Sequence, residues 1–244
     1  MKKIFLILAA CLVIVSCKKH TEDIEVATPM VTVSFTQQLV SSNSMVRSTT
    51  NEFLDIIEEQ TPKYVNVTLK NLDLDKTYTC KSNESITIPV GNYNISGYID
   101  GKYVYNMMYS SPSLNSTIVN LNIDSNTKVI TLNVHYNCFA VFALIDECSN
   151  CTYTYGGGTT FNKFGKYYVG YFKNNSDETS ANIKLTPYSD STEFISTTYT
   201  FSTVYDKDKI YAEYGKYYVI HPQKVDKTTS SFELVLPDMI EGDI

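Results

Sequence analysis

Few residues of this chain could carry out catalysis. Its histidines stand at positions 20, 135 and 221, and no Gly-x-Ser-x-Gly sequence occurs, so little is available to build a Ser–His nucleophile. Gly156-Gly157-Gly158 is followed by neither the Lys-Ser/Thr pair nor the helix of a phosphate-binding loop. We interpret it as a loop between strands. Paired glycosidase carboxylates lie far apart in sequence and would leave no motif, but the residues as a whole predict that the protein is not an enzyme.

Two pairs of carboxylates have the spacing that calcium loops use, namely Asp73 with Asp75 and Asp206 with Asp208. Neither pair is followed by the central glycine and the terminal glutamate of such a loop. Polar turns are therefore the favoured interpretation, and the sequence predicts no metal ion and no other cofactor.

Cysteines offer a second kind of chemistry. Cys148-Ser149-Asn150-Cys151 lies in a turn-like segment, for which a loop disulfide, free thiols and half of a zinc site are the alternatives. His135, His221 and Cys138 show no ligand spacing toward this pair, which disfavours zinc. Thioredoxin-like redox chemistry would require the motif to open a helix. The candidate disulfide Cys148–Cys151 and plain thiols both remain open.

The N-terminal residues indicate export. Lys2 and Lys3 precede an unbroken apolar run, Ile4 to Val15, which is shorter than the roughly 20 residues that a membrane-spanning helix needs. Ile14-Val15-Ser16-Cys17 resembles the bacterial lipobox. That resemblance implies cleavage before Cys17 and acylation of its thiol, and several acyl chains on one residue give lasting attachment. We therefore expect a signal peptide at 1–16 and a lipidated, polar tether at 17–28.

Composition excludes some partners and favours strands. Removal of residues 1–16 takes away two lysines and no acid, which changes the formal net charge from −6 to −8. An acidic chain is not expected to bind nucleic acid, nor to grip anionic lipid through basic residues. Twenty tyrosines and eleven phenylalanines, without tryptophan, are typical of β-strands.

Period-two alternation predicts an all-β protein of two antiparallel β-sandwich domains, transthyretin-like or Greek-key, at 29–135 and 136–244. Clear examples are Val31-Val33-Phe35 and Ile130-Leu132-Val134, whereas Cys138 to Ile145 is apolar on both faces and suits a central strand. One short helix is expected at 51–59, with Thr50 or Asn51 as its N-cap.

Tyrosines cluster on the expected hairpins. Adjacent tyrosines point to opposite faces of a strand, so one ring of each pair could be exposed. Ordinary sheet surface is the simpler interpretation; the functional one is a patch that stacks on sugars or contacts a protein partner. The residues of this candidate binding surface are Tyr103, Tyr105, Tyr167, Tyr168, Tyr217 and Tyr218.

The layout resembles the fimbrillin-like surface lipoproteins of Bacteroidetes. The resemblance rests on the lipobox, a short tether, a first strand at Val31–Phe35, and a loop containing Met45-Val46-Arg47-Ser48; Ile86 to Tyr93 also resembles a strand-turn-strand of transthyretin-like sandwiches. It implies fimbrial shaft, tip or anchor subunits of two such domains. It further implies that Arg47, the one arginine of the chain, matches the position where shaft subunits are cleaved to release a strand. The C-terminal residues 231–244 give no clear donor-strand signature. The Cys-x-x-Cys sequence is not part of the pattern of that family.

Two functions follow as expectations. The first is a structural or adhesive subunit, lipid-anchored at the outer membrane and cell surface, with other fimbrial subunits or a host or glycan surface as partners. The second is a surface glycan-binding lipoprotein that accompanies a polysaccharide-uptake system, although the absence of tryptophan counts against it.

Overall fold

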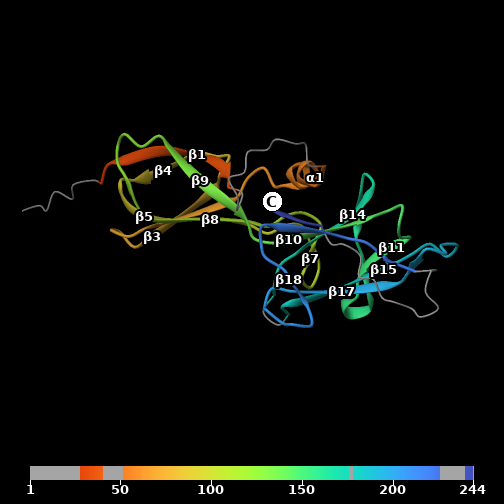
Figure 1. The fold of residues 1–244 in the computed structure, drawn as a ribbon. Helices are drawn as coiled ribbons and strands as arrows, with labels where there is room; N and C mark the ends of the chain where they lie inside the picture. The colour runs from red at the N-terminus through yellow and green to blue at the C-terminus, as the bar shows by residue number, and fades with distance from the viewer. Residues whose placement is uncertain (1–27, 41–51, 176–177, 226–239, 244) are drawn as a thin grey trace, which may run out of the picture.

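The computed structural model describes residues 28–40, 52–175, 178–225 and 240–243, and most of these residues lie in β-strands (Figure 1). Buried and exposed side chains alternate along most of the long strands, as the period of an extended chain requires. The structure confirms the all-β class that the sequence predicts. Among the described residues, no helix has the length and apolar character needed to cross a membrane.

Seven strands form the first sandwich. They are β1 (Met30–Leu39), β2 (Asn66–Asn71), β3 (Lys76–Lys81), β4 (Ile86–Pro89), β5 (Gly91–Ile99), β8 (Leu114–Ile123) and β9 (Val129–Tyr136). Their lateral order is β3-β2-β5-β8-β9-β1-β4. Because β8 and β9 pair only where Leu114 faces Tyr136 and Asn115 faces His135, the three strands β9, β1 and β4 diverge and form a second layer (Figure 1).

The core of this first sandwich is made of the inward side chains of both layers. Leu69 of β2, Ile95 of β5, Val33 of β1 and Leu132 of β9 are each at most 1% exposed. Burial of such aliphatic side chains stabilises a fold by about 1.5–3 kcal/mol each relative to leaving them exposed. The two layers are therefore held together by apolar contact rather than by hydrogen bonds.

The remaining strands build a second sandwich. They are β6 (Tyr103–Tyr105), β7 (Met108–Tyr109), β10 (Phe139–Leu144), β11 (Asn150–Tyr153), β12 (Thr159–Thr160), β13 (Asn162–Phe164), β14 (Tyr167–Phe172), β15 (Ser180–Thr186), β16 (Phe194–Ile195), β17 (Thr197–Ser202), β18 (Ile210–Tyr211), β19 (Lys216–Ile220), β20 (Gln223–Lys224) and β21 (Ile240–Asp243). One sheet has the order β21-β19-β10-β14-β7-β6, with β13 also on β14, and the facing sheet has the order β12-β11-β15-β17-β18. β16 and β20 form a separate pair.

The boundary predicted at residue 135 falls inside β9, the last strand of the first sandwich, and β10 begins the second. The hairpin β6–β7 crosses this boundary, because it follows β5 in the chain but β7 pairs with β14 through Tyr109↔Tyr171 and Met108↔Phe172. The division into two domains stays a prediction. The sequence also predicts a strand at 232–236, which lies outside the described residues.

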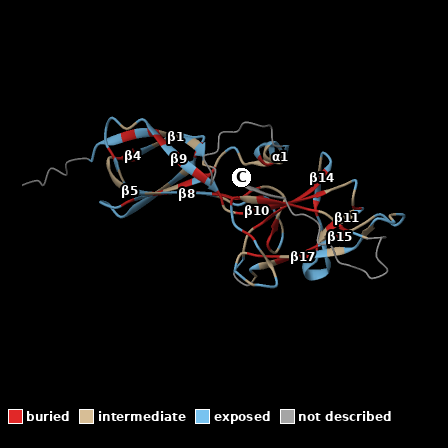
Figure 2. Cartoon of the chain, viewed as in Figure 1, coloured by how far each residue is buried: buried red, intermediate tan, exposed pale blue. Residues whose placement is uncertain are grey.

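Strands β10, β14 and β19 are buried on both faces, as the colouring of β10 and β14 in Figure 2 illustrates. One face, with Phe139 and Tyr218, joins the core of the second sandwich, whereas Phe142 and Tyr217 on the other face join the core that continues into the first. The central strand expected at 138–145 is thus confirmed as β10.

Helix α1 (Glu52–Gln60) covers part of the second of these faces (Figure 1). The ring of Phe53 lies 5.0–5.3 Å, between centroids, from the rings of Phe142, Tyr167 and Tyr217. At the start of the helix, the carboxylate of Glu52 accepts a hydrogen bond from the hydroxyl of Tyr167 and lies 3.0 Å from the ammonium of Lys166. The helix predicted at 51–59 is confirmed within one residue, although the predicted N-cap residues lie outside the described ones.

A polar contact joins the end of β5 to the end of β14. The ammonium of Lys173 lies 2.7 Å from the carboxylate of Asp100, donates to the hydroxyl of Tyr98 and stands 4.7 Å from the centre of that ring. Burial acts to raise the pKa of Asp100, but the bonds from Lys173 and Tyr98 outweigh it and hold this pKa below its usual value. Burial likewise acts to lower the pKa of Lys173, and the same partners raise it above normal.

The contact between Asp100 and Lys173 predicts a pH-dependent loss of stability. Because the pKa of Asp100 is lower in the fold than its unfolded value of about 4, the pair stabilises the protein above that pH, and its contribution disappears as the pH falls through the folded pKa. At pH 7, Asp100→Asn should lower the free energy of unfolding by about 1 kcal/mol, since the carboxylate is partly exposed. Urea unfolding at pH 7 and pH 3 measures this difference, which should shrink at pH 3. Asp208→Asn, in an exposed turn, is the control; an equal loss at both pH values would contradict the assignment.

The docking of α1 predicts a second effect on stability. Replacing Phe53 by alanine removes a ring that contacts three aromatic side chains, so we expect a loss of about 2–3 kcal/mol in urea unfolding. Glu59→Ala, on the exposed face of the same helix, should change stability by less than about 0.5 kcal/mol. Equal effects of the two substitutions would show that the helix is not docked through Phe53.

Candidate functional site

Strand β1 has a different partner along each of its halves. Its first half pairs antiparallel with β4, from Met30↔Pro89 to Val33↔Ile86. Its second half pairs parallel with β9, from Ser34↔Val129 to Leu39↔Val134. β1 therefore stands between β4 and β9 in the strand order, and it pairs with each of them along a different half of its length.

The inner face of β1 completes the core of the first sandwich. Val31 and Val33 are 4% and 0% exposed, and Phe35 packs against the same cluster. The outer face carries Thr32, whose hydroxyl lies 2.8 Å from that of Thr87 on β4, and the exposed Thr36. β1 thus contributes a narrow apolar stripe, held at its edges by backbone hydrogen bonds.

The position of β1 between its two partners is therefore a site that a β-strand occupies. Without β1, the backbone groups of β4 and β9 that now pair with it would be unpaired, and the core would lose two buried valines. Unpaired strand edges beside exposed apolar surface are the template for addition of another strand. Alternate side chains at the positions of Val31, Val33 and Phe35 would determine which strand fits.

Arg47 and Cys17 both lie outside the described residues. The elements on either side of Arg47 are described: Val40 still donates its backbone N–H to the carbonyl oxygen of Val134, and Glu52 begins α1. The strand before Arg47 belongs to the first sandwich, whereas the helix after it is bound to β10, β14 and β19 through Phe53. The two sides of Arg47 are thus attached to different sheets.

The structure corrects the expected tyrosine surface. Tyr167, Tyr168, Tyr217 and Tyr218 are all at most 5% exposed. Adjacent rings do point to opposite faces, as expected, but both faces of β14 and β19 are covered by apolar cores. These four tyrosines offer no binding surface.

Tyr103 and Tyr105 are exposed, by 60% and 39%, on β6 at the edge of its sheet. Three tyrosines outside the six of the expected binding surface lie beside them, and we call the five together the tyrosine row. Its members are Tyr98, Tyr103, Tyr105, Tyr109 and Tyr155. The rings of Tyr103 and Tyr109 lie 5.7 Å apart, and those of Tyr105 and Tyr155 lie 6.0 Å apart, between centroids.

The described cysteines are free thiols, so the candidate disulfide Cys148–Cys151 is not formed in this structure. Both side chains are buried. Burial raises the pKa of Cys148 to about 12 and that of Cys151 well above its ordinary value, which disfavours thiolate chemistry. Among the described residues, no three His, Cys, Asp or Glu side chains converge as metal ligands would, and His221 instead bonds Glu147 at 2.7 Å.

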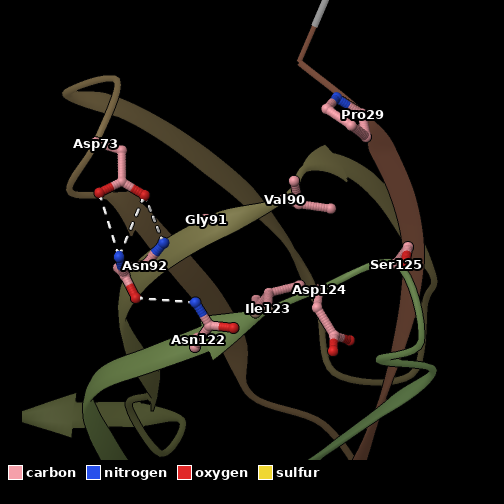
Figure 3. Close-up of a pocket in the computed structure, with 9 residues that line it drawn as sticks. All are labelled: Pro29, Asp73, Val90, Gly91, Asn92, Asn122, Ile123, Asp124 and Ser125. Atoms are coloured by element: carbon pink, nitrogen blue, oxygen red, sulfur yellow. Dashed lines mark hydrogen bonds between the residues drawn. The ribbon is translucent and has the colours of Figure 1, made fainter.

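A shallow depression of about 350 Å³ lies at one end of the first sandwich (Figure 3). Its carboxylates already have structural partners. Asp73 accepts the backbone N–H of Asn92 at 2.7 Å, and Asp124 accepts the N–H groups of Asn126 and Thr127 at 2.9 Å each. Gly91 allows Asp73 to approach, because a Cβ at this position would lie 2.6 Å from the carboxylate oxygen. These contacts are those of turn-forming residues, as the spacing of Asp73 and Asp75 suggested.

Comparison with known proteins gives structural likeness alone. No family model and no curated sequence matches the chain. The tip fimbrial protein Mfa3 from Porphyromonas gingivalis, truncated at its C-terminus, is 7% identical with a TM-score of 0.47, and the alignment covers 88% of this chain and 100% of that one.

Two candidate cell adhesion proteins are also similar. The one from Bacteroides uniformis is 8% identical with a TM-score of 0.41 (74% of this chain, 90% of that one), and the one from Bacteroides eggerthii is 10% identical with a TM-score of 0.40 (88% and 96%). The solved structures to which this chain is similar thus include adhesion and fimbrial proteins of Bacteroidetes, the group that the sequence resembles.

Proposed function

We propose that this chain is a lipid-anchored protein of the outer-membrane surface that acts as a fimbria-like structural or adhesive subunit, without enzymatic activity. The observation that carries the proposal is the position of β1, between β4 and β9 and ahead of the one arginine of the chain. A strand held in this way is a removable part of its own sandwich. Its removal prepares a site for a strand of another subunit.

The proposal requires that removal of β1 leave the rest folded. Along the chain, residues 41–51 connect β1 to α1, and α1 is bound to β10, β14 and β19 by the contacts of Phe53 and Glu52. The core of the second sandwich contains no residue of β1. Cleavage after Arg47 should therefore open the first sandwich while the second keeps its packing.

A chain that is cleaved after Arg47 is no longer covalently attached to its lipid anchor. Lipid on Cys17 is connected to the folded body through residues 18–47, so a cut after Arg47 separates the lipid from the body once β1 leaves. Uncut protein would serve as a membrane-bound anchor, and cut protein would join a polymer. One gene product could thus fill either position in a filament, depending on proteolysis.

The anchor makes a direct prediction. Cys17→Ala should abolish acylation and leave an unprocessed precursor or a form that does not partition with membranes, because the thiol is the lipid acceptor. Mass spectrometry of the N-terminal peptide and membrane fractionation measure this. Cys11→Ala, within the apolar run of the signal peptide, is the matched control and should be processed normally. An unmodified wild-type N-terminal peptide, together with normal membrane partition of Cys17→Ala, would refute the anchor.

The removable strand makes the second prediction. An arginine-specific protease has one target in the whole chain, so native protein should give a single cut after Arg47, and Arg47→Lys should resist it. Cut protein should bind a labelled peptide with the sequence of Met30–Leu39 or polymerise, whereas uncut protein should do neither.

The peptide provides its own control. With aspartate in place of both Val31 and Val33 it keeps its backbone but loses the apolar stripe, and its affinity should fall at least about tenfold, because two charges would enter the core. Cut protein that stays monomeric and binds both peptides equally would remove the shaft role. If native protein resists cleavage, the shaft role is excluded and the anchor role is the one that remains.

A further inference from the structure

The tyrosine row combines exposed rings from three segments of the chain. Tyr98 comes from β5, Tyr103, Tyr105 and Tyr109 from the hairpin β6–β7, and Tyr155 from the 3-10 turn η1 (Tyr155–Gly157). Tyr98, Tyr103, Tyr105 and Tyr155 are between 39% and 60% exposed. The pairing of β7 with β14 brings these segments together where the two sandwiches meet.

The rings of the row are held in place. The hydroxyl of Tyr103 accepts the backbone N–H of Asn106 at 2.8 Å, and the hydroxyl of Tyr98 accepts a hydrogen bond from Lys173. Tyr105 packs against Gly156, where a Cβ would lie only 2.3 Å from the tyrosine hydroxyl. Rings that are already ordered lose little conformational entropy when a ligand binds.

The chemistry of the row limits the class of ligand. Every large apolar side chain that is well exposed on β6, β7 and η1 is a tyrosine, so the surface offers flat rings with hydroxyl tips and no aliphatic anchor. The charged group that bonds the row at Tyr98 is neutralised, because Lys173 is paired with Asp100 at 2.7 Å. A neutral ligand with apolar C–H faces and many hydroxyl groups fits such a surface better than an anion or an aliphatic peptide.

We propose that the tyrosine row binds a neutral oligosaccharide, whose sugar rings stack on Tyr103 and Tyr105 while its hydroxyls bond the tyrosine hydroxyls around them. This inference rests on the proposed adhesive function and names the class of its receptor. The row lies on the β6 edge of the second sandwich's sheet, whereas β1 belongs to the sheet of the first, so a single subunit could bind a glycan and a neighbouring subunit together.

The test uses the full mature chain and a panel of neutral oligosaccharides of four to eight sugars, with a sialylated panel of equal length. Saturation-transfer NMR should detect binding to members of the neutral panel. The double variant Tyr103→Ala/Tyr105→Ala should weaken that binding at least about tenfold, since two stacking contacts are lost. Tyr205→Ala removes the most exposed of the described tyrosines, at 80%, and should leave binding unchanged.

Three results would overturn the inference: no binding by the folded wild-type chain, equal binding by the double variant, or binding of the sialylated panel alone. A double variant that loses self-association of the uncut chain but not sugar binding would instead identify the row as a contact between copies. Capture of the β1 peptide by the cut double variant separates the two proposals. Capture without sugar binding refutes the glycan surface and leaves the subunit function standing.

Discussion

The sheet formed by β10, β14 and β19 has an apolar core on each of its faces, and the other elements are arranged around it. On one face, Phe139 and Tyr218 pack toward β15 and β17; on the other, Phe142 and Tyr217 receive the ring of Phe53 from α1. A sheet covered on both sides needs strands that are apolar at nearly every position, and these three strands are so apart from Lys216 at the start of β19. This shared layer keeps the two sandwiches in one continuous structure.

Against this fixed layer, β1 is paired with two strands of the first sandwich, β4 and β9. It completes the core of the first sandwich through a narrow stripe of valines, and its pairing with two different strands places it in the interior of the sheet order. Removal of β1 would expose an edge of β4 and an edge of β9 at once, which favours its replacement by another strand. Because the helix that follows β1 is bound to the second sandwich, removal of β1 need not unfold that sandwich. Under the proposed function, stability and strand exchange thus belong to different parts of the chain.

The tyrosines are also divided, between packing in the cores and exposure on the surface. Most of the tyrosines expected on hairpins are used for packing, and the two exposed ones, Tyr103 and Tyr105, lie where β6–β7 leaves the first sandwich to pair with β14. The ion pair of Lys173 with Asp100 holds the same junction. A ligand bound to the tyrosine row would therefore contact both sandwiches, and the junction would determine how firmly its rings are presented.

The sequence by itself determined the strand content, the short helix, the two-faced strand at 138–145 and the polar turns at Asp73 and Asp206, because each follows from local periodicity or turn chemistry. Tertiary structure decided the rest. Alternation places Tyr167 and Tyr168 on opposite faces, but whether a face meets water depends on strands that are distant in sequence, and both faces proved to be buried. The pairing of β7 with β14 and the position of β1 between β4 and β9 are likewise long-range. No local pattern encodes which edges meet, since every strand offers the same backbone hydrogen bonds.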